Sequence, residues 1–98
     1  MIDWQKIVGF DWDVGNVNKN EAHQVSMVEA EQVFFNEPLI ILEDVKHSGL
    51  EYRLHALGIT TDGRKLHITF TLRSGSTKIR VISARDMHKR ERLIYEAT

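Results

Sequence analysis

Three stretches in the second half of the chain alternate between apolar and polar residues, and this pattern limits the possible folds more than any other feature. In residues 65–73 every second residue is apolar, and residues 51–59 and 78–84 have nearly the same period. Side chains of a β-strand point alternately to the two faces of its sheet, so each stretch predicts a strand with one apolar face. Asp62-Gly63 and Ser74-Gly75-Ser76 separate the stretches and predict two tight turns. The sequence therefore predicts an antiparallel sheet.

The first half of the chain predicts helices and two shorter strands. Ser26-Met27-Val28-Glu29 matches a capping box, so a helix is expected from Met27 to about Phe35. Short apolar runs predict strands at residues 7–12 and 39–42, and Asp13 offers a cap for a weaker helix at residues 16–23.

A last helix is expected after the third alternating stretch, capped by Asp86 and ending near Ala97. The fold class is then α+β, with two N-terminal helices and one C-terminal helix on an antiparallel sheet. The helices are expected on the sheet face that carries Leu54, Ile68, Phe70 and Val81. Residues 1–98 are expected to form a single domain.

The other face of the predicted sheet is too polar to belong to a core. It carries one carboxylate, two imidazoles and three guanidiniums, which are Glu51, Arg53, His55, His67, Arg73 and Arg80. Further cations follow along the chain, Arg85 at the bend after the last strand and Lys89, Arg90 and Arg92 on the final helix, so basic groups from strand and helix are expected to meet at one corner. A guanidinium suits phosphate because it donates two parallel hydrogen bonds, so this corner and the basic sheet face are expected to bind RNA. The alternative is that these charges only coat a solvated surface.

Charge is distributed unevenly along the chain, although the net charge is only −1. Residues 1–50 hold three lysines and nine carboxylates, a net charge of −6, whereas residues 51–98 hold ten lysines or arginines and five carboxylates, a net charge of +5. Seven of those ten cations are arginines, which favours an anionic partner.

Several kinds of site and segment are excluded or not expected. The chain has no cysteine, which excludes disulfides and thiolate metal sites. His55 and His67 have no third metal ligand close by in the sequence, so neither a metal nor another cofactor is expected. No stretch predicts a signal peptide or a membrane span, and a cytoplasmic location is expected.

Motifs along most of the chain resemble the BrnT family of type II toxins. The most specific motif is Ile79-Arg80-Val81-Ile82-Ser83-Ala84-Arg85, which is followed by Glu91-Arg92 and Tyr95, and the resemblance extends from Phe10 to Glu96. It implies a compact RelE-like ribonuclease fold and an endoribonuclease activity that halts translation. It also implies a BrnA-type antitoxin, which neutralises the toxin and binds operator DNA, so that the toxin reaches DNA only through its partner.

The polar face offers the groups that metal-independent RNA cleavage needs. In that reaction the 2′-hydroxyl attacks the neighbouring phosphate, so a group must accept a proton and others must stabilise negative charge. Arg73 and Arg80 are expected to clamp the phosphate, with Arg53 as a third cation, and Glu51 or His23 to accept the proton. Further RNA contacts are expected from Lys19, His55, His67, Arg85, Lys89 and Arg92. The antitoxin is expected to cover the same basic face.

Alternatives remain for individual residues and for the function. Glu51 is also explained as the ion-pair partner of an arginine, Arg85 as a support of the bend after the last strand, and His23 as a surface residue. The family carries a basic residue beside this histidine, whereas Ala22 and Gln24 flank His23 here. That difference favours a second function, a catalytically weak or inactive binding module that acts as partner and co-repressor of a DNA-binding antitoxin.

Overall fold

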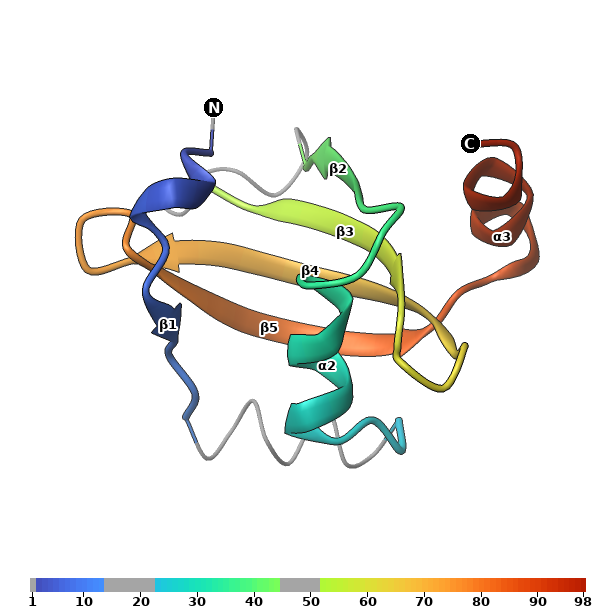
Figure 1. Cartoon of the computed structure of the whole chain (residues 1–98), viewed down its shortest axis with the longest axis horizontal. Coiled ribbons are helices and arrows are strands. Elements are labelled where there is room, and N and C mark those ends of the chain that lie inside the picture. The colour runs from blue at the N-terminus through green and yellow to red at the C-terminus, as the bar shows by residue number, and fades with distance from the viewer. Residues whose placement is uncertain (1, 14–22, 45–51) are drawn as a thin grey trace.

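A computed structural model of the chain describes residues 2–13, 23–44 and 52–98. The described elements form an α+β fold, as predicted, in which helices lie around one curved sheet (Figure 1). In chain order they are the 3-10 helix η1 (Trp4–Lys6), β1 (Gly9–Phe10), α2 (Met27–Val33), β2 (Ile40–Glu43), β3 (Leu54–Ile59), β4 (Lys65–Arg73), β5 (Lys78–Asp86) and α3 (Lys89–Glu96). The weaker N-terminal helix expected at residues 16–23 falls almost wholly outside the described residues.

The sheet has five strands in the order β1-β5-β4-β3-β2 and is mixed (Figure 1). Strands β2 to β5 are antiparallel to their neighbours, but β1 runs parallel to β5, with Gly9 opposite Lys78 and Phe10 opposite Ile79. The expected fully antiparallel sheet is therefore wrong at one edge. Alternation within a strand says nothing about the direction of its neighbour, and β1 is only two residues long.

The two predicted turns join β3 to β4 and β4 to β5. Gly63 has a φ of 91°, a left-handed conformation that glycine adopts without steric cost. Its backbone N–H donates to the carbonyl of Thr60 at 3.0 Å, and the Thr60 N–H donates to the carbonyl of Arg64 at 2.9 Å. The hairpin expected at Asp62-Gly63 is thus confirmed.

One extra residue interrupts the pairing of β4 with β5. Thr69 lies opposite Ser83, but the next residue, Phe70, lies opposite Val81, so Ile82 forms a β-bulge. Before and after the bulge, the side chains that face α2 are Ile79, Val81 and Ala84, all buried.

Helix α2 covers one face of the sheet. Ser26 is its N-cap and accepts from the Glu29 N–H at 3.1 Å, while the Glu29 carboxylate accepts from the Ser26 N–H at 3.0 Å. The predicted capping box is confirmed, although the helix ends at Val33 rather than near Phe35. Behind α2 lies the main core, which includes Val33, Leu54, Ile68, Phe70, Ile79 and Val81.

Helix α3 differs from the prediction in its start and in its position. It begins at Lys89 with His88 as N-cap, so the expected cap at Asp86 is wrong, because Asp86 is the last residue of β5 and pairs with Arg64 instead. Tyr95 of α3 packs with Met87 and Leu57 in a second cluster. Ala56 of β3 points toward α2, so its neighbour Leu57 points to the other face of the sheet. Because Leu57 packs against Tyr95, α3 covers one end of that other face.

Within the part of the chain that the structure describes, no helix is long and apolar enough to cross a membrane.

Candidate functional site

The sheet face that α2 does not cover is lined by polar side chains. Directly opposite residues in neighbouring strands share a face, and the register pairs His55 with Thr69, His67 with Arg85, and Thr71 with Arg80. We call this surface the polar face. Its side chains in the three central strands include His55, His67, Thr69, Thr71, Arg73, Arg80, Ser83 and Arg85.

Three cations lie together at the end of the polar face farthest from α3. Lys78 is directly opposite Arg73, and Arg80 is the diagonal neighbour of Arg73 two residues further along β5. Diagonal neighbours on one face are about 7–8 Å apart, within reach of long side chains. Arg53 precedes β3 on the same side, and the Thr71 hydroxyl there donates to the carbonyl of Tyr52 at 2.6 Å. Lys78 is not among the site residues predicted from the sequence, although alternation from Arg80 places it on the same face.

Arg80 is held by carboxylates from the segment after β1. Its guanidinium donates to Asp13 and lies 3.7 Å from the Asp11 carboxylate, while about a quarter of its side chain stays exposed. Between these acids, the indole N–H of Trp12 donates to Glu31 of α2 at 2.8 Å. The run Asp11-Trp12-Asp13 is visible in the sequence. That its acids meet Arg80 of β5 could not be predicted, because the contact depends on the parallel pairing of β1 with β5. Arg53 and Arg73 also interact with other groups.

A pair of imidazoles lies in the middle of the polar face. The ring centres of His55 and His67 are 4.8 Å apart. His55 Nε2 lies 3.0 Å from the carboxylate of Asp44, and His55 Nδ1 lies 3.1 Å from the hydroxyl of Thr69. Asp44 and Thr69 together fix the orientation of the His55 ring on this face. The sequence could not place Asp44 here, since residues 45–53 separate it from β3.

His67 is nearly buried and uncharged at neutral pH. Burial, and after it the charge of Arg85, lower the pKa of His67 from 6.5 to about 4, although the charge of Glu91 acts in the opposite direction. Its Nε2 lies 3.8 Å from the Glu91 carboxylate. Since the ring is 9% exposed, His67 belongs to the floor of the polar face more than to its surface.

Arg85 supports the connection between β5 and α3. Its guanidinium makes two hydrogen bonds to the Glu91 carboxylate, at 2.8 and 3.0 Å, and a third to the carbonyl of Asp86 at 3.1 Å. Burial raises the pKa of Glu91, but the hydrogen bonds from Arg85 and from the His88 N–H lower it more, to about 2. The geometry fits the structural alternative for Arg85.

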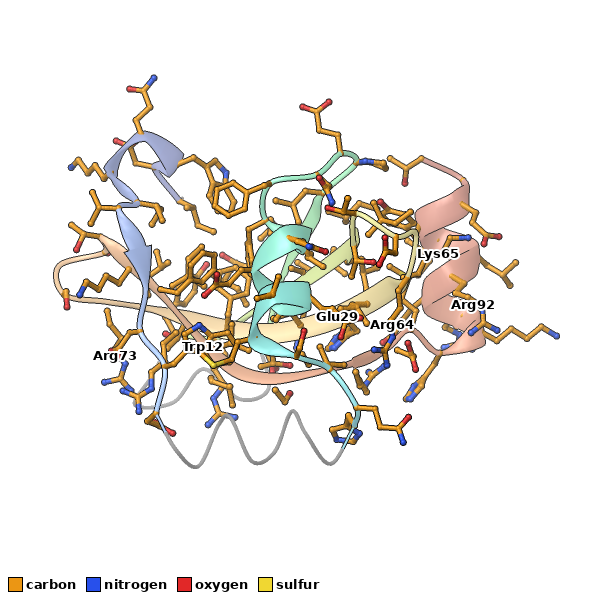
Figure 2. All side chains as sticks on the ribbon, turned by 60° about the horizontal axis from the view of Figure 1, so that its bottom comes forward. Trp12, Glu29, Arg64, Lys65, Arg73 and Arg92 are labelled. Atoms are coloured by element: carbon orange, nitrogen blue, oxygen red, sulfur yellow. The ribbon has the colours of Figure 1, made fainter. Side chains whose placement is uncertain are left out.

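The remaining cations of α3 lie at the same end of the molecule as Arg85. Arg92 donates to the carbonyl of Met87 at 2.9 Å, and Lys89 is exposed. Figure 2 shows Arg92 on α3 and Arg73 at the opposite end of the sheet. The structure thus divides the predicted RNA-contacting cations into two separate groups.

Arg64 is not among the site residues predicted from the sequence, and it holds three segments together. It pairs with Asp86 at 2.7 Å and with Glu29 at 3.2 Å, and it donates to the carbonyls of Gln24 at 2.6 Å and His23 at 3.4 Å. The hydrogen bond from Arg64 lowers the pKa of Asp86. Arg64 therefore fixes the approach to α2, beside Glu29 in Figure 2.

His23 is not brought to the arginines that were expected to share its function. It is exposed and lies where its carbonyl reaches Arg64, just before β4, whereas Arg73 ends β4. Arg64 and Arg73 are nine positions apart along extended chain, which corresponds to about 30 Å. Glu51 and Lys19 lie outside the described residues.

The structure offers a defined set of chemical groups at one end of the polar face. Arg73, Lys78 and Arg80 supply positive charge and hydrogen-bond donors. His55, which contacts Asp44, supplies an imidazole that can transfer protons. It lies opposite Thr69, two residues along β4 from Thr71, which is opposite Arg80. Such a set can bind an anion and move a proton beside it. Among the described residues, no three histidine or acidic side chains are grouped so that they could hold a metal ion.

Comparison with known proteins assigns a family to this arrangement. Residues 12–91 match the model of a family described as the ribonuclease toxin BrnT of a type II toxin–antitoxin system. No match is found among curated proteins. Because the match covers most of the chain, including strands β2 to β5 and the start of α3, the chain belongs to the BrnT family of ribonuclease toxins.

Proposed function

We propose that the chain is an endoribonuclease that cuts RNA on its polar face, without a metal, by attack of the 2′-hydroxyl on the adjacent phosphate. The 2′-oxygen–phosphorus bond forms while the bond to the 5′-oxygen breaks. The proton of the 2′-hydroxyl goes to a base, and a proton is returned to the departing 5′-oxygen. The products are a 2′,3′-cyclic phosphate and a 5′-hydroxyl.

The observation that supports this site is the presence of Arg73, Arg80 and Lys78 on one open face with His55. Arginine donors aimed at the phosphate stabilise the added charge of the transition state, and one such donor is worth on the order of 10²–10³-fold in rate. Arg53 is a third guanidinium at this end. The arginines cannot remove a proton, because they stay protonated at any relevant pH.

We assign proton transfer to His55, with Glu51 as the second candidate. His55 is held on two sides by Asp44 and Thr69 and is a quarter exposed, so a small movement of the threonine hydroxyl would free its Nδ1. His23 was the other predicted base, and its place near Arg64 makes it a poorer choice. We propose the remaining predicted contacts, Lys19, His67, Arg85, Lys89 and Arg92, only as secondary determinants of RNA binding.

The family supplies the biological setting of this proposal. A type II system pairs the toxin with a protein antitoxin, which we expect to be of the BrnA type and to carry the operator-binding domain. Cleavage of RNA would lower translation in the cytoplasm. We further expect the sheet and its helices, including the one predicted at residues 16–23, to resemble the RelE-like ribonucleases.

Cleavage of single-stranded RNA in EDTA tests the proposal directly. The wild-type chain should cut, and Arg80→Ala should lower the rate by about 10²-fold or more, because one transition-state donor is lost. Lys6→Ala removes a cation from exposed η1 and serves as the matched control, which should cut like the wild type. The 3′ ends of the products should carry the cyclic phosphate.

One observation favours the second function, the non-cleaving binding module. Arg80 already binds Asp13, and Arg85 already binds Glu91, so both guanidiniums have acidic partners in the folded chain. Intact RNA after incubation with correctly folded wild-type chain, together with tight antitoxin binding, would establish the module and reject the enzyme. Cleavage that requires an added divalent cation would reject the metal-independent route.

A further inference from the structure

We infer that an apolar surface on the α2 side of the sheet anchors the antitoxin, by receiving an apolar segment of that protein flanked by lysine or arginine. The inference rests on the toxin–antitoxin setting of the proposed function, but not on the proposed chemistry. We call this surface the Trp4 surface. It consists of two neighbouring hollows that share the side chain of Trp4.

The first hollow lies between the N-terminal segment and the end of α2. Its volume is about 640 Å³, and aromatic and aliphatic side chains form most of its wall. Principal lining residues are Trp4, Val8, Phe10, Phe34, Phe35 and Leu39. The ring centroids of Phe10 and Phe34 are 5.7 Å apart with the rings tilted, and the Phe34 ring meets that of Phe70 in the core edge to face at 5.1 Å, so the floor of the hollow is fixed.

The second hollow lies on the other side of Trp4, toward the β2 edge of the sheet. Its volume is about 440 Å³, and it is lined by Ile2, Ile41, Tyr52 and Leu54 besides Trp4 and Glu43. Trp4 is 42% exposed and stands between the two hollows. A partner segment that lies across Trp4 would therefore fill both.

Large apolar side chains on this surface are open to solvent. Phe35 is 77% exposed and Val8 is 76% exposed, the two highest values among the large apolar residues that the structure describes. Contiguous exposed apolar surface on a small protein marks an interaction site, because leaving it in water is unfavourable. Aromatic residues are also the side chains that most often dominate binding energy.

The charge around the Trp4 surface defines the chemistry of its occupant. Glu31 and Glu37 line the first hollow and Glu43 the second, while no lysine or arginine in the described ranges lines either one. The Glu31 carboxylate is fixed by Trp12, and Glu43 accepts from the Tyr52 hydroxyl. Three carboxylates repel RNA and favour a cationic partner, so the occupant is a basic, apolar protein segment.

The Trp4 surface and the polar face lie on opposite sides of the sheet. Ile79 and Leu54, which line the two hollows, belong to the core side that faces α2, whereas Arg80 and His55 point away from it. Loss of the anchor therefore leaves the RNA site unchanged. An antitoxin bound here can extend from its anchor around the sheet edge to the polar face.

Binding of the purified antitoxin encoded beside this gene tests the inference by calorimetry. Phe35→Asp places a charge in the first hollow, and Glu37→Lys reverses the charge of its rim. Both should weaken antitoxin binding by at least about 10-fold, as expected for the centre of an interface. Leu93→Asp is the matched control for Phe35, since Leu93 is 60% exposed on α3, and Asp62→Lys, in the exposed β3–β4 turn, is the control for Glu37. Both controls should bind within about twofold of the wild type.

Other results of the binding experiment would overturn either the inference or the identity of the occupant. Unchanged binding by both variants overturns the inference, and so does equal weakening by variants and controls. If Phe35→Asp instead converts a dimer of the isolated chain to a monomer, with antitoxin binding retained, the occupant is a second copy. RNA cleavage by Phe35→Asp should equal that of the wild type. Wild-type chain that binds antitoxin through this surface but leaves RNA intact would reject the enzyme and keep the anchor.

Discussion

At the scale of single residues, three basic side chains of the polar face each have a carboxylate partner that lies outside their own strand. His55 has Asp44, Arg80 has Asp11 and Asp13, and Arg85 has Glu91. The alternating pattern placed His55 and Arg80 on the correct face but could not supply their acids, and Arg85 reaches this face only because of the β-bulge at Ile82. Those contacts depend on strand order and on the position of α3, which no local pattern encodes.

His67 makes the stability of the fold depend on pH. The unfolded imidazole binds a proton near pH 6.5, but the folded one only near pH 4, because burial disfavours its charge. Between these values the unfolded state binds more protons, so stability is full above about pH 6.5 and falls as the pH is lowered toward 4. From pH 7 to pH 5 the loss from this group should be about 2 kcal/mol, measured by urea unfolding.

His67→Gln should abolish most of this difference, whatever its effect on stability at pH 7. His23→Gln changes an exposed imidazole at another site and should leave the difference intact. A difference of the same size in both variants would show that His67 is not its source.

At the scale of elements, local signals predicted α2, the Asp62-Gly63 hairpin and strands β3 to β5. They also predicted β1 and α3 as elements, but failed for the direction of β1, which depends on a pairing made across the whole chain, and for the start and position of α3. The C-terminal helix was placed with α2 because its few apolar residues did not indicate a face. Tyr95 decides that position, since it is buried with Leu57 and Met87 and its hydroxyl donates to the carbonyl of Pro38 at 2.7 Å.

Gly58 determines how closely α2 approaches β3. A Cβ atom at this position would lie 2.5 Å from Cγ1 of Val33, far inside normal contact. Gly58→Ala should therefore destabilise the fold by roughly 1–3 kcal/mol through overpacking, measured by chemical unfolding. The same change in a Val33→Ala background should cost clearly less, because the clashing methyl groups are gone. Equal costs in both backgrounds would show that the clash with Val33 is not the cause.

At the scale of the whole molecule, folding brings the acidic half of the sequence against its basic half. Glu29 pairs with Arg64, Asp44 with His55, and Asp13 with Arg80. The charge poles that are separate along the sequence are thus partly neutralised in space. What remains are two sides of the sheet with different chemistry, one with cations near Arg73 and one with acids around Trp4.

This neutralisation limits how strongly RNA binding depends on salt. If only Arg53, Arg73 and Arg80 contact phosphates, the plot of log affinity against log salt concentration should have a slope of about −2 for single-stranded RNA. Contact by all ten cations of residues 51–98 would give about −7. Fluorescence anisotropy with a labelled, non-cleavable 2′-deoxy or 2′-methoxy strand measures this slope, and a value near −7 would contradict the small site.

The extra residue in β5, Ile82, determines to which sheet face the later side chains of this strand point. Arg80 and Arg85 are separated by an odd number of positions, which in an unbroken strand would send them to opposite sides. Because Ile82 absorbs one step, both end on the same side, and Ala84 faces the core. Gain or loss of one codon here would exchange the surroundings of Arg85 and Ala84 while leaving the composition of the strand almost unchanged. The number of residues in this strand therefore determines, as much as their identity does, which side chains lie on the polar face.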